Sequence, residues 1–241
     1  ERYTDSWGCL WETTTNGITG TVIEHPLAHW EAFENFAAPD PAEQDGWGPI
    51  NWENIEQNLA RARQNGRLAS GGLRHGHTFM TLMYIRGYEN LIFDMADADP
   101  RLRKLIGMVE DFNLGLVERY VARGVEWMGY PEDLGMQSGP MLAPDHFRNY
   151  LKPTYKRLIQ PARDTGCIIP MHSDGDIREL ADDLVDCGMD VLNLQDLVNG
   201  IDWIRDNLRG RVCIDLDVDR QRITRYGAPA DIDALDRKSV V

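Results

Sequence analysis

The stretch GCIIPMHSDGDIREL, residues 166–180, contains the pattern that decides the fold. It places a glycine before a short apolar run, then a polar corner, then the start of an amphipathic segment. A glycine directly after a helix is the usual left-handed C-terminal cap. A short apolar run bounded by turn residues is typical of a buried strand. The stretch therefore predicts the order helix, strand, polar corner, helix.

The same order recurs at four other places along the chain. The runs RLAS, VEWMGY, MDVLNL and RVCIDL follow Gly66, Gly124, Gly188 and Gly210. Strands that alternate with helices pair in parallel. The fold class that we predict is α/β, as a (β/α)8 TIM-type barrel. A doubly wound sheet is the alternative, but neither GxGxxG nor GxxxxGK[ST] follows any of the runs.

Three segments are expected along the chain. Residues 1–50 are predicted to form an N-terminal excursion with a small hairpin or loop, and residues 51–235 the barrel. Residues 236–241, DRKSVV, interrupt a helix-like segment and are expected to be a non-native tail. We also expect the barrel to be incomplete, as in a fragment that is truncated at its C-terminal end.

Two helices can be placed by their apolar spacing. One is predicted from about Arg101 to Arg123, and another from Ile177 to Val185. Pro153 and Pro161 interrupt the segment 145–165 and predict a kink or a new helix start there.

Composition narrows the class of protein. The 241 residues are 42% apolar, and the net charge is −14. An acidic surface repels phosphate backbones and anionic lipid, so we expect neither nucleic acid nor membrane partners. No apolar run reaches the roughly 18–20 residues that cross a bilayer. The four cysteines form no close pair, and Cys167 and Cys213 are expected to be buried in strands. A cytoplasmic protein is the simplest interpretation.

Polar side chains follow several of the predicted strands, at the positions where a parallel α/β barrel carries its chemistry. They are Asp133 and Gln137, His172 and Asp174, Gln195 and Asp196, and Asp215 and Asp217. The corners therefore bring carboxylates, amides and one imidazole to one face. Such a set can bind a divalent metal or share protons.

Most of these corners also have a structural interpretation. Asp133 can be a turn residue, and Asp174 or Asp176 can cap the helix that follows. Glu179 stands three residues after Asp176, as in a capping box, so we predict that Asp176 is a helix cap. For His172, at the end of a strand, we predict a role in the site.

A histidine pair in RHGHTF, His75 and His77, follows the first predicted strand. The pair can reach the same face and suits a metal, or it can be a feature of a glycine-rich loop. The motifs GxSxG and HExxH do not occur, and no cysteine stands beside a histidine.

Four segments resemble the uroporphyrinogen decarboxylase superfamily, which includes the decarboxylase and the corrinoid- and coenzyme M-linked methyltransferases. They are IRGYENLIFDM (85–95), EDLGMQSGPMLAPDHFRNYLKPTYKRLI (132–159), MHSDGDIRELADDLVDCGMDVLNLQ (171–195) and DLDVDRQRITRYGAP (215–229). DSWGCLWE and EHPL near the N-terminus resemble the methyltransferase-like branch. The resemblance implies a (β/α)8 barrel with its site at the C-terminal face.

The resemblance also implies a metal site. In the zinc methyltransferases of this superfamily the corner reads His-x-Cys-Gly, and the His and Cys bind zinc together with a later Cys. Here His172 matches the His, and Asp174 stands in place of the Cys. Zinc accepts carboxylate oxygen as well as thiolate sulfur. The resemblance therefore implies Zn²⁺ at His172 and Asp174, while the loss of sulfur argues against alkylation of coenzyme M.

The function that this resemblance implies is a corrinoid-linked, metal-dependent methyltransferase. Its substrate would be a methyl ether, a methylamine or a methyl-corrinoid, a partner corrinoid protein would dock over the strand ends, and a homodimer is left open. The expected catalytic residues are Asp133, His172 and Asp174, and Asp133 would act as general acid or as a further ligand. The expected substrate-binding residues are Gln137, Gln195, Asp217 and His77.

Two other functions stay open. Uroporphyrinogen decarboxylation, a step of porphyrin biosynthesis, would need neither metal nor cofactor. That enzyme holds an octacarboxylate with arginines, whereas its arginine-bearing N-terminal motif is not found here and the corners are acidic. The third interpretation is a barrel that binds a ligand without catalysis.

Overall fold

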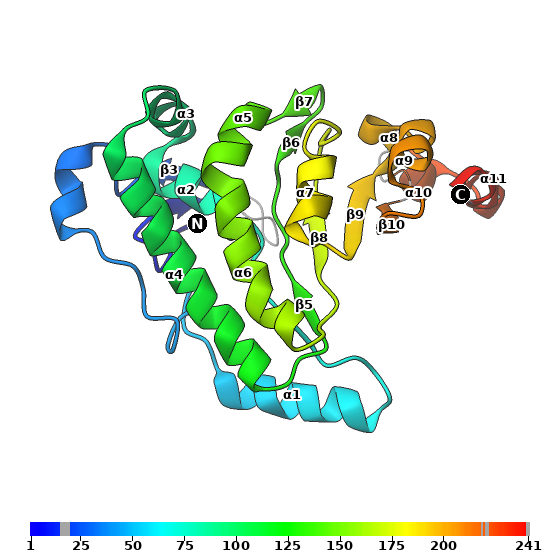
Figure 1. Cartoon of the computed structure of the whole chain (residues 1–241), viewed down its shortest axis with the longest axis horizontal. Coiled ribbons are helices and arrows are strands. Elements are labelled where there is room, and N and C mark those ends of the chain that lie inside the picture. Colours follow the sequence, from blue (N-terminus) through cyan, green and yellow to red (C-terminus); the bar gives the residue numbers. More distant parts are fainter. Residues whose placement is uncertain (15–19, 218, 220–221, 240–241) are drawn as a thin grey trace.

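The computed structural model describes residues 1–14, 20–217, 219 and 222–239. Its centre is a set of parallel strands: β4 (Ser70–Gly72), β5 (Trp127–Gly129), β8 (Pro170–Ser173), β9 (Val191–Gln195) and β10 (Cys213–Asp217). β4 pairs with β5, and β9 lies between β8 and β10. A parallel bridge from Trp127 to Ile168 joins the two groups. The strands therefore follow one another in space as they do in the chain (Figure 1).

The predicted pattern of glycine and strand is confirmed at all five places. Each glycine has a left-handed backbone, with φ between 65° at Gly66 and 102° at Gly188. Each strand begins three or four residues later. The positive φ lets the chain leave the helix and turn back toward the sheet, which residues other than glycine adopt rarely.

The order of the strands distinguishes the two α/β alternatives. A doubly wound sheet reverses its strand order at a switch point, whereas the order here is sequential. The α/β class is confirmed. Within the described ranges β4 and β10 are edge strands and no further strand links them, so closure into an eight-stranded barrel stays a prediction.

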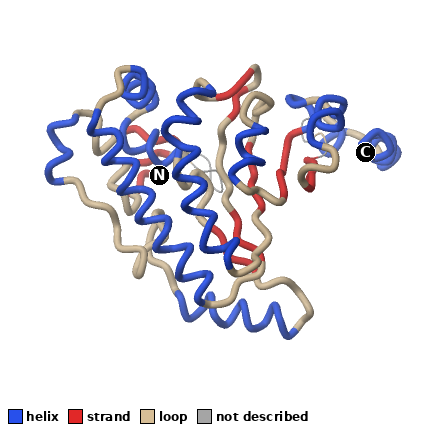
Figure 2. The backbone as a smooth tube through the Cα atoms, in the orientation of Figure 1, coloured by secondary structure: helices blue, strands red, loops and turns tan. Residues whose placement is uncertain are grey.

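Helices connect the strands. Two long helices, α4 (Pro100–Ala122) and α6 (Lys152–Asp164), pack side by side against the strands (Figure 1). The others along the chain are α1 (Trp52–Gln64), α2 (Phe79–Arg86), α3 (Tyr88–Ala96), α5 (Pro144–His146), α7 (Ala181–Cys187), α8 (Asp196–Asn199), α9 (Ile201–Leu208), α10 (Ile223–Tyr226) and α11 (Pro229–Ser239) (Figure 2). A π-helical turn, η2 (Phe147–Leu151), leads directly into α6.

The helix predictions were right in one case and wrong in another. The helix predicted at 101–123 is α4, and the new start predicted near Pro153 is the first turn of α6. The helix predicted from Ile177 begins only at Ala181, after a turn. The capping prediction for Asp176 is therefore wrong.

Asp176 stabilises the preceding turn instead. Its carboxylate accepts the backbone N–H of Arg178 at 3.2 Å and pairs with the Arg178 guanidinium at 2.6 Å. The Arg178 guanidinium holds the pKa of this carboxyl below its usual value. Ile177, where a helix was expected to begin, has its N–H bound by Asn199 Oδ1 at 3.1 Å.

The N-terminal excursion is a small antiparallel sheet of β1 (Arg2–Thr4), β2 (Leu10–Glu12) and β3 (Thr21–Glu24), followed by the 3₁₀ helix η1 (Trp30–Asn35). It packs on the same core as the parallel strands, because the Trp11 ring meets Tyr84 with centroids 4.7 Å apart. At the other end, α11 runs through most of the predicted tail, and residues 240 and 241 of that tail lie outside the described residues.

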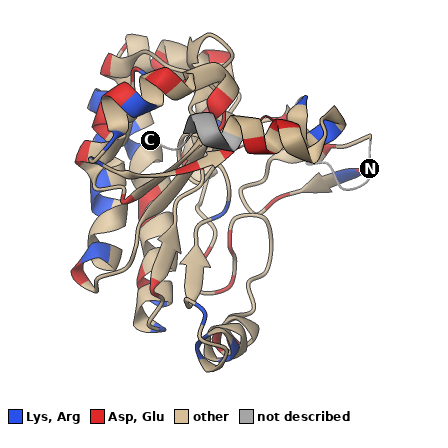
Figure 3. Ribbon diagram, turned by 90° about the vertical axis from the view of Figure 1, so that its right-hand side faces the viewer, with Lys and Arg blue, Asp and Glu red and all other residues tan. Residues whose placement is uncertain are grey.

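The distribution of charged residues and the apolar length of the helices can be compared with what the composition predicted. Acidic and basic residues are mixed along the outer helices (Figure 3). No helix in the described part of the chain is long and apolar enough to cross a bilayer. Among the cysteines, Cys167 is buried as predicted, but Cys213 is exposed because β10 lies at a sheet edge.

Candidate active site

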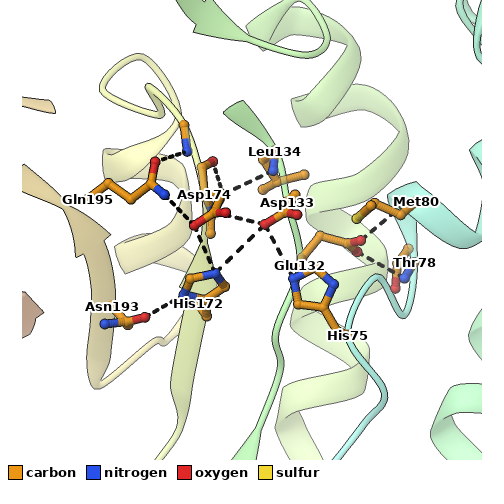
Figure 4. A network of polar contacts seen from close by, with 12 residues as sticks. His75, Thr78, Met80, Glu132, Asp133, Leu134, His172, Asp174, Asn193 and Gln195 are labelled. Atoms are coloured by element: carbon orange, nitrogen blue, oxygen red, sulfur yellow. Dashed lines mark hydrogen bonds and ion pairs between the residues drawn. The ribbon is translucent and has the colours of Figure 1, made fainter. Parts of the chain in front are cut away.

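Side chains from several of the predicted polar corners, Asp133, His172, Asp174 and Gln195, converge at the C-terminal ends of the parallel strands (Figure 4). His172 lies on β8, and Asp133 and His75 follow the ends of β5 and β4. β9 pairs with β8 in a register that places Asn193 beside His172, and β10 pairs with the other edge of β9. Parallel pairing therefore assembles side chains that lie far apart in the sequence, as expected for this architecture.

His172 is held in one orientation by Asn193. The ring Nδ1 is hydrogen-bonded to Asn193 Oδ1, and Asn193 Nδ2 donates to the backbone carbonyl of Asp215 at 3.0 Å. A carbonyl oxygen only accepts, so the amide nitrogen must face β10 and the amide oxygen must face His172. The imidazole therefore donates from Nδ1, and its Nε2 is the nitrogen available to a ligand.

The Nε2 atom of His172 points at carboxylates. It lies 3.2 Å from Asp174 Oδ1 and 3.8 Å from Asp133 Oδ1. With Nδ1 already protonated, an unprotonated Nε2 would present a lone pair to two anionic oxygens, which repel it. A cation bound between these atoms would stabilise the arrangement.

Asp133 receives donors from two sides. Its Oδ1 accepts the backbone N–H of Asp174 at 3.0 Å and lies 3.3 Å from His75 Nε2. Partial burial raises the pKa of Asp133, but the hydrogen bonds from His75 and from the Asp174 amide outweigh it and lower the pKa overall. The same contact with Asp133 raises the pKa of His75.

Asp174 is positioned by Gln195 from the neighbouring strand. Gln195 Nε2 donates to Asp174 Oδ1 at 2.6 Å, and Gln195 Oε1 accepts the N–H of Gly175 at 2.9 Å. Gly175 has φ 81°, and a Cβ built there would lie 2.2 Å from the backbone of Gly135. The loop is therefore fixed closely against β6 (Gly135–Met136). Gln195 was predicted to bind substrate, but both of its amide atoms already bind this loop.

The described residues contain two groups of side chains that could each hold a metal ion. One is His75, Asp133 and His172, and the other is His172, Asp174 and Asp217. In each group the ligand atoms lie within 4.8 Å of one another. His172 belongs to both groups, and Asp217 also accepts Asn193 Nδ2 at 3.4 Å.

Two predicted substrate-binding residues lie elsewhere. His77 is only 1% exposed, and its ring packs edge-on against Tyr130 and Tyr155. Burial lowers the pKa of His77 to about 3, so it is a neutral core residue and the prediction was wrong. Gln137 is exposed at the turn between β6 and β7 (Gly139–Pro140), and no contact among the described residues joins it to the polar cluster.

Glu132, which the sequence did not single out, fixes the corner beside Asp133. It is fully buried and accepts the N–H groups of Thr78 and Phe79 at 2.9 Å and of Met80 at 3.1 Å. It also accepts the Tyr155 hydroxyl at 3.0 Å. The first turn of α2 is thus capped by a carboxylate from the segment that follows β5, which holds the β4 and β5 corners together.

Replacing Asn193 with leucine should release the ring of His172. At a pH where the ring is neutral, we expect the wild-type protein to show the Nδ1–H tautomer and the Asn193→Leu protein mostly the Nε2–H tautomer, measured by long-range ¹H–¹⁵N NMR. Asn193→Asp keeps the acceptor and should restore the Nδ1–H form. Asn207→Leu, at an exposed amide on α9, is the control. An Nδ1–H tautomer that persists in Asn193→Leu would contradict the assignment.

Comparisons with known proteins agree with this architecture. A methyltransferase from Methanosarcina mazei has a similar structure, with a TM-score of 0.73 and 17% sequence identity over 97% of this chain. The present chain spans 66% of that methyltransferase chain. At this identity the likeness concerns the fold. No curated protein sequence matches the chain. The family model for uroporphyrinogen decarboxylase (URO-D) matches residues 8–233, and the chain therefore belongs to the uroporphyrinogen decarboxylase family.

Proposed function

We propose that this chain belongs to a methyltransferase-type enzyme that uses a divalent metal, Zn²⁺, bound at His172 and Asp174. The observation that carries the proposal is the arrangement around His172. Its only available nitrogen faces two carboxylates at 3.2 and 3.8 Å, at the strand ends of a chain whose fold resembles that of a methyltransferase.

The residues present fit such an ion. Zinc is bound in proteins by imidazole nitrogen and carboxylate oxygen, usually with four ligands and with one position left open in catalytic sites. His172 supplies the nitrogen and Asp174 an oxygen, and Asn193 and Gln195 hold these two side chains in place. When bound, the metal would act as a Lewis acid that polarises a leaving oxygen or stabilises a thiolate.

The substrate would be a small methylated compound or a methyl-corrinoid. A corrinoid protein would dock over the strand ends around His172. Asp133 would serve as a general acid or as a further ligand, since it lies within reach of the same nitrogen. The carboxylates Asp133, Asp174 and Asp217 give this corner a negative charge, which disfavours an octacarboxylate porphyrinogen.

Metal analysis combined with a transfer assay tests the proposal. We expect the purified protein to contain near-stoichiometric zinc by elemental mass spectrometry. It should demethylate free methylcob(III)alamin in the presence of a thiol, followed by the visible absorbance of cob(I)alamin. Methylcobalamin loses its methyl group to the thiolate sulfur, and both electrons of the cobalt–carbon bond stay on cobalt.

Removal of the metal with a chelator should abolish this activity, and added zinc should restore it. Full transfer activity in metal-free protein would overturn the role of the metal. Turnover of uroporphyrinogen by metal-free protein, without any methyl transfer, would overturn the proposed reaction.

A further inference from the structure

The two groups of potential metal ligands share one nitrogen. His172 Nδ1 is bonded to Asn193, so only Nε2 can reach an ion. Asp174 follows β8 and Asp217 ends β10, whereas His75 and Asp133 follow β4 and β5. An ion at His172 could therefore take its remaining ligands either from His75 and Asp133 or from Asp174 and Asp217.

The spacing of the donor atoms favours the side of β4 and β5. Around a tetrahedral ion with bonds of about 2.0–2.2 Å, neighbouring ligand atoms lie roughly 3.3–3.6 Å apart. The distance from His75 Nε2 to Asp133 Oδ1 is 3.3 Å, and that from Asp133 Oδ1 to His172 Nε2 is 3.8 Å. His75, Asp133 and His172 thus form one group with donor atoms within 4.8 Å of one another, whereas Asp174 Oδ1, 3.2 Å from His172 Nε2, belongs to the other group.

Residues outside this ligand group hold its donor atoms in place. The Asp174 N–H binds Asp133 Oδ1 at 3.0 Å, and the buried Glu132 fixes the β5 corner. His75 has a side chain that is 46% exposed, and its ring centroid lies 5.8 Å from that of His172, so it can adjust its position toward an ion. Asp217 Oδ1 accepts a hydrogen bond from Asn193, the residue that orients His172.

We propose that His75 and Asp133 join His172 as ligands of the ion, giving a two-histidine, carboxylate-bound zinc centre without sulfur. The inference rests on the proposed function and deepens it, because it assigns the second imidazole of the site to His75. A centre of nitrogen and oxygen donors suits Zn²⁺ and other borderline divalent ions rather than soft thiolate-preferring ones.

Zinc affinity, measured by competition with a chromophoric chelator, tests which of the two residue groups binds the ion. His172→Ala should lose zinc binding altogether. His75→Ala and His75→Gln should weaken zinc binding by more than about 100-fold, beyond the range of outer-shell partners. Asp217→Asn should weaken it by less than about tenfold, as for a residue that acts through Asn193. His29→Ala, at an exposed histidine before η1, should bind zinc like the wild type.

X-ray absorption at the zinc edge gives a second readout that does not depend on activity. The wild-type protein should show outer-shell scattering from two imidazoles and no zinc–sulfur scattering, and His75→Ala should show one imidazole. Circular dichroism would verify that each variant is folded, and His75→Gln preserves the size of the side chain if His75→Ala does not fold.

The failure of this inference is distinguishable from that of the proposed function. Wild-type affinity in both His75 variants, with an unchanged imidazole count, would overturn the role of His75 while zinc at His172 stands. A loss of affinity in Asp217→Asn larger than in His75→Ala would also overturn it. A wild-type protein that binds no zinc would overturn the proposed function itself.

Discussion

His172→Ala is expected to lose bound zinc and to lower kcat/KM for demethylation of methylcobalamin by about 10³-fold or more, roughly 4 kcal/mol of transition-state stabilisation. His172 is the one side chain shared by both potential ligand groups. Without it, Asp133 and Asp174 lose the ring nitrogen that lies beside both of their carboxylates. The measurements are zinc content by elemental mass spectrometry and initial rates at saturating thiol.

The fold should tolerate this substitution. The ring of His172 is 25% exposed, and its hydrogen bond to Asn193 contributes about 1 kcal/mol. His29→Ala is the matched control, because that histidine is exposed and lies far from β8 in the chain. If His172→Ala kept wild-type zinc content and rate, the metal would have to be bound elsewhere and the proposed site would be wrong.

The strand pattern was predictable because its cause is local. A glycine with a positive φ, an apolar run and a polar corner can each be recognised within a few residues, as at Gly166 and His172. Closure of a barrel depends on pairing between strands that are distant in sequence. Neither β4 nor β10 carries a local sequence pattern that indicates such pairing. Closure of the barrel was therefore harder to predict from the sequence than the strands themselves.

The site was predictable in part for the same reason. Placing polar residues at strand ends correctly brought together Asp133, His172 and Asp174. Asn193 was overlooked, although in VLNLQ it alternates with leucines and so shares a face with Gln195. Register with β8 then puts it beside His172, and that register is not encoded in either strand alone.

The histidine pair shows that spacing in the sequence does not predict which of two side chains reaches the site. His75 and His77 are equivalent as a motif, but the turn before α2 sends His75 to the surface and His77 into the core. The backbone carbonyl of His77 accepts Asn113 Nδ2 at 2.7 Å, a contact from α4 that fixes the turn. This long-range contact, rather than the spacing of the two histidines, accompanies the burial of His77.

Glu132 was missed because the helix that it caps is far away in the sequence. Thr78, at the N-cap position of α2, makes no capping hydrogen bond, and its hydroxyl binds His77 instead. The orphan amides at the start of α2 must therefore find a partner from another element. The carboxylate of Glu132, 54 residues away from Thr78, supplies it.

Glu132→Gln is accordingly expected to destabilise the protein by about 3 kcal/mol, the cost of leaving buried donors unsatisfied around a lost charge. One carboxylate oxygen accepts Thr78, Phe79 and the Tyr155 hydroxyl, and the other accepts Met80. In glutamine one of these oxygens becomes an NH₂ group, which places a donor against a donor. For a chain of this size the melting temperature should fall by roughly 6–12 °C, measured by differential scanning calorimetry.

The effect should extend to the metal, because the β5 corner that Glu132 fixes also carries Asp133. Zinc affinity in Glu132→Gln should fall by about 10–100-fold, as for other outer-shell substitutions. Glu89→Gln, at an exposed position in the first turn of α3, is the control and should stay within about 0.5 kcal/mol of the wild type. A Glu132→Gln protein as stable as this control would mean that water satisfies the amides of α2, and the corner would then owe its geometry to the strand pairing of β4 with β5 alone.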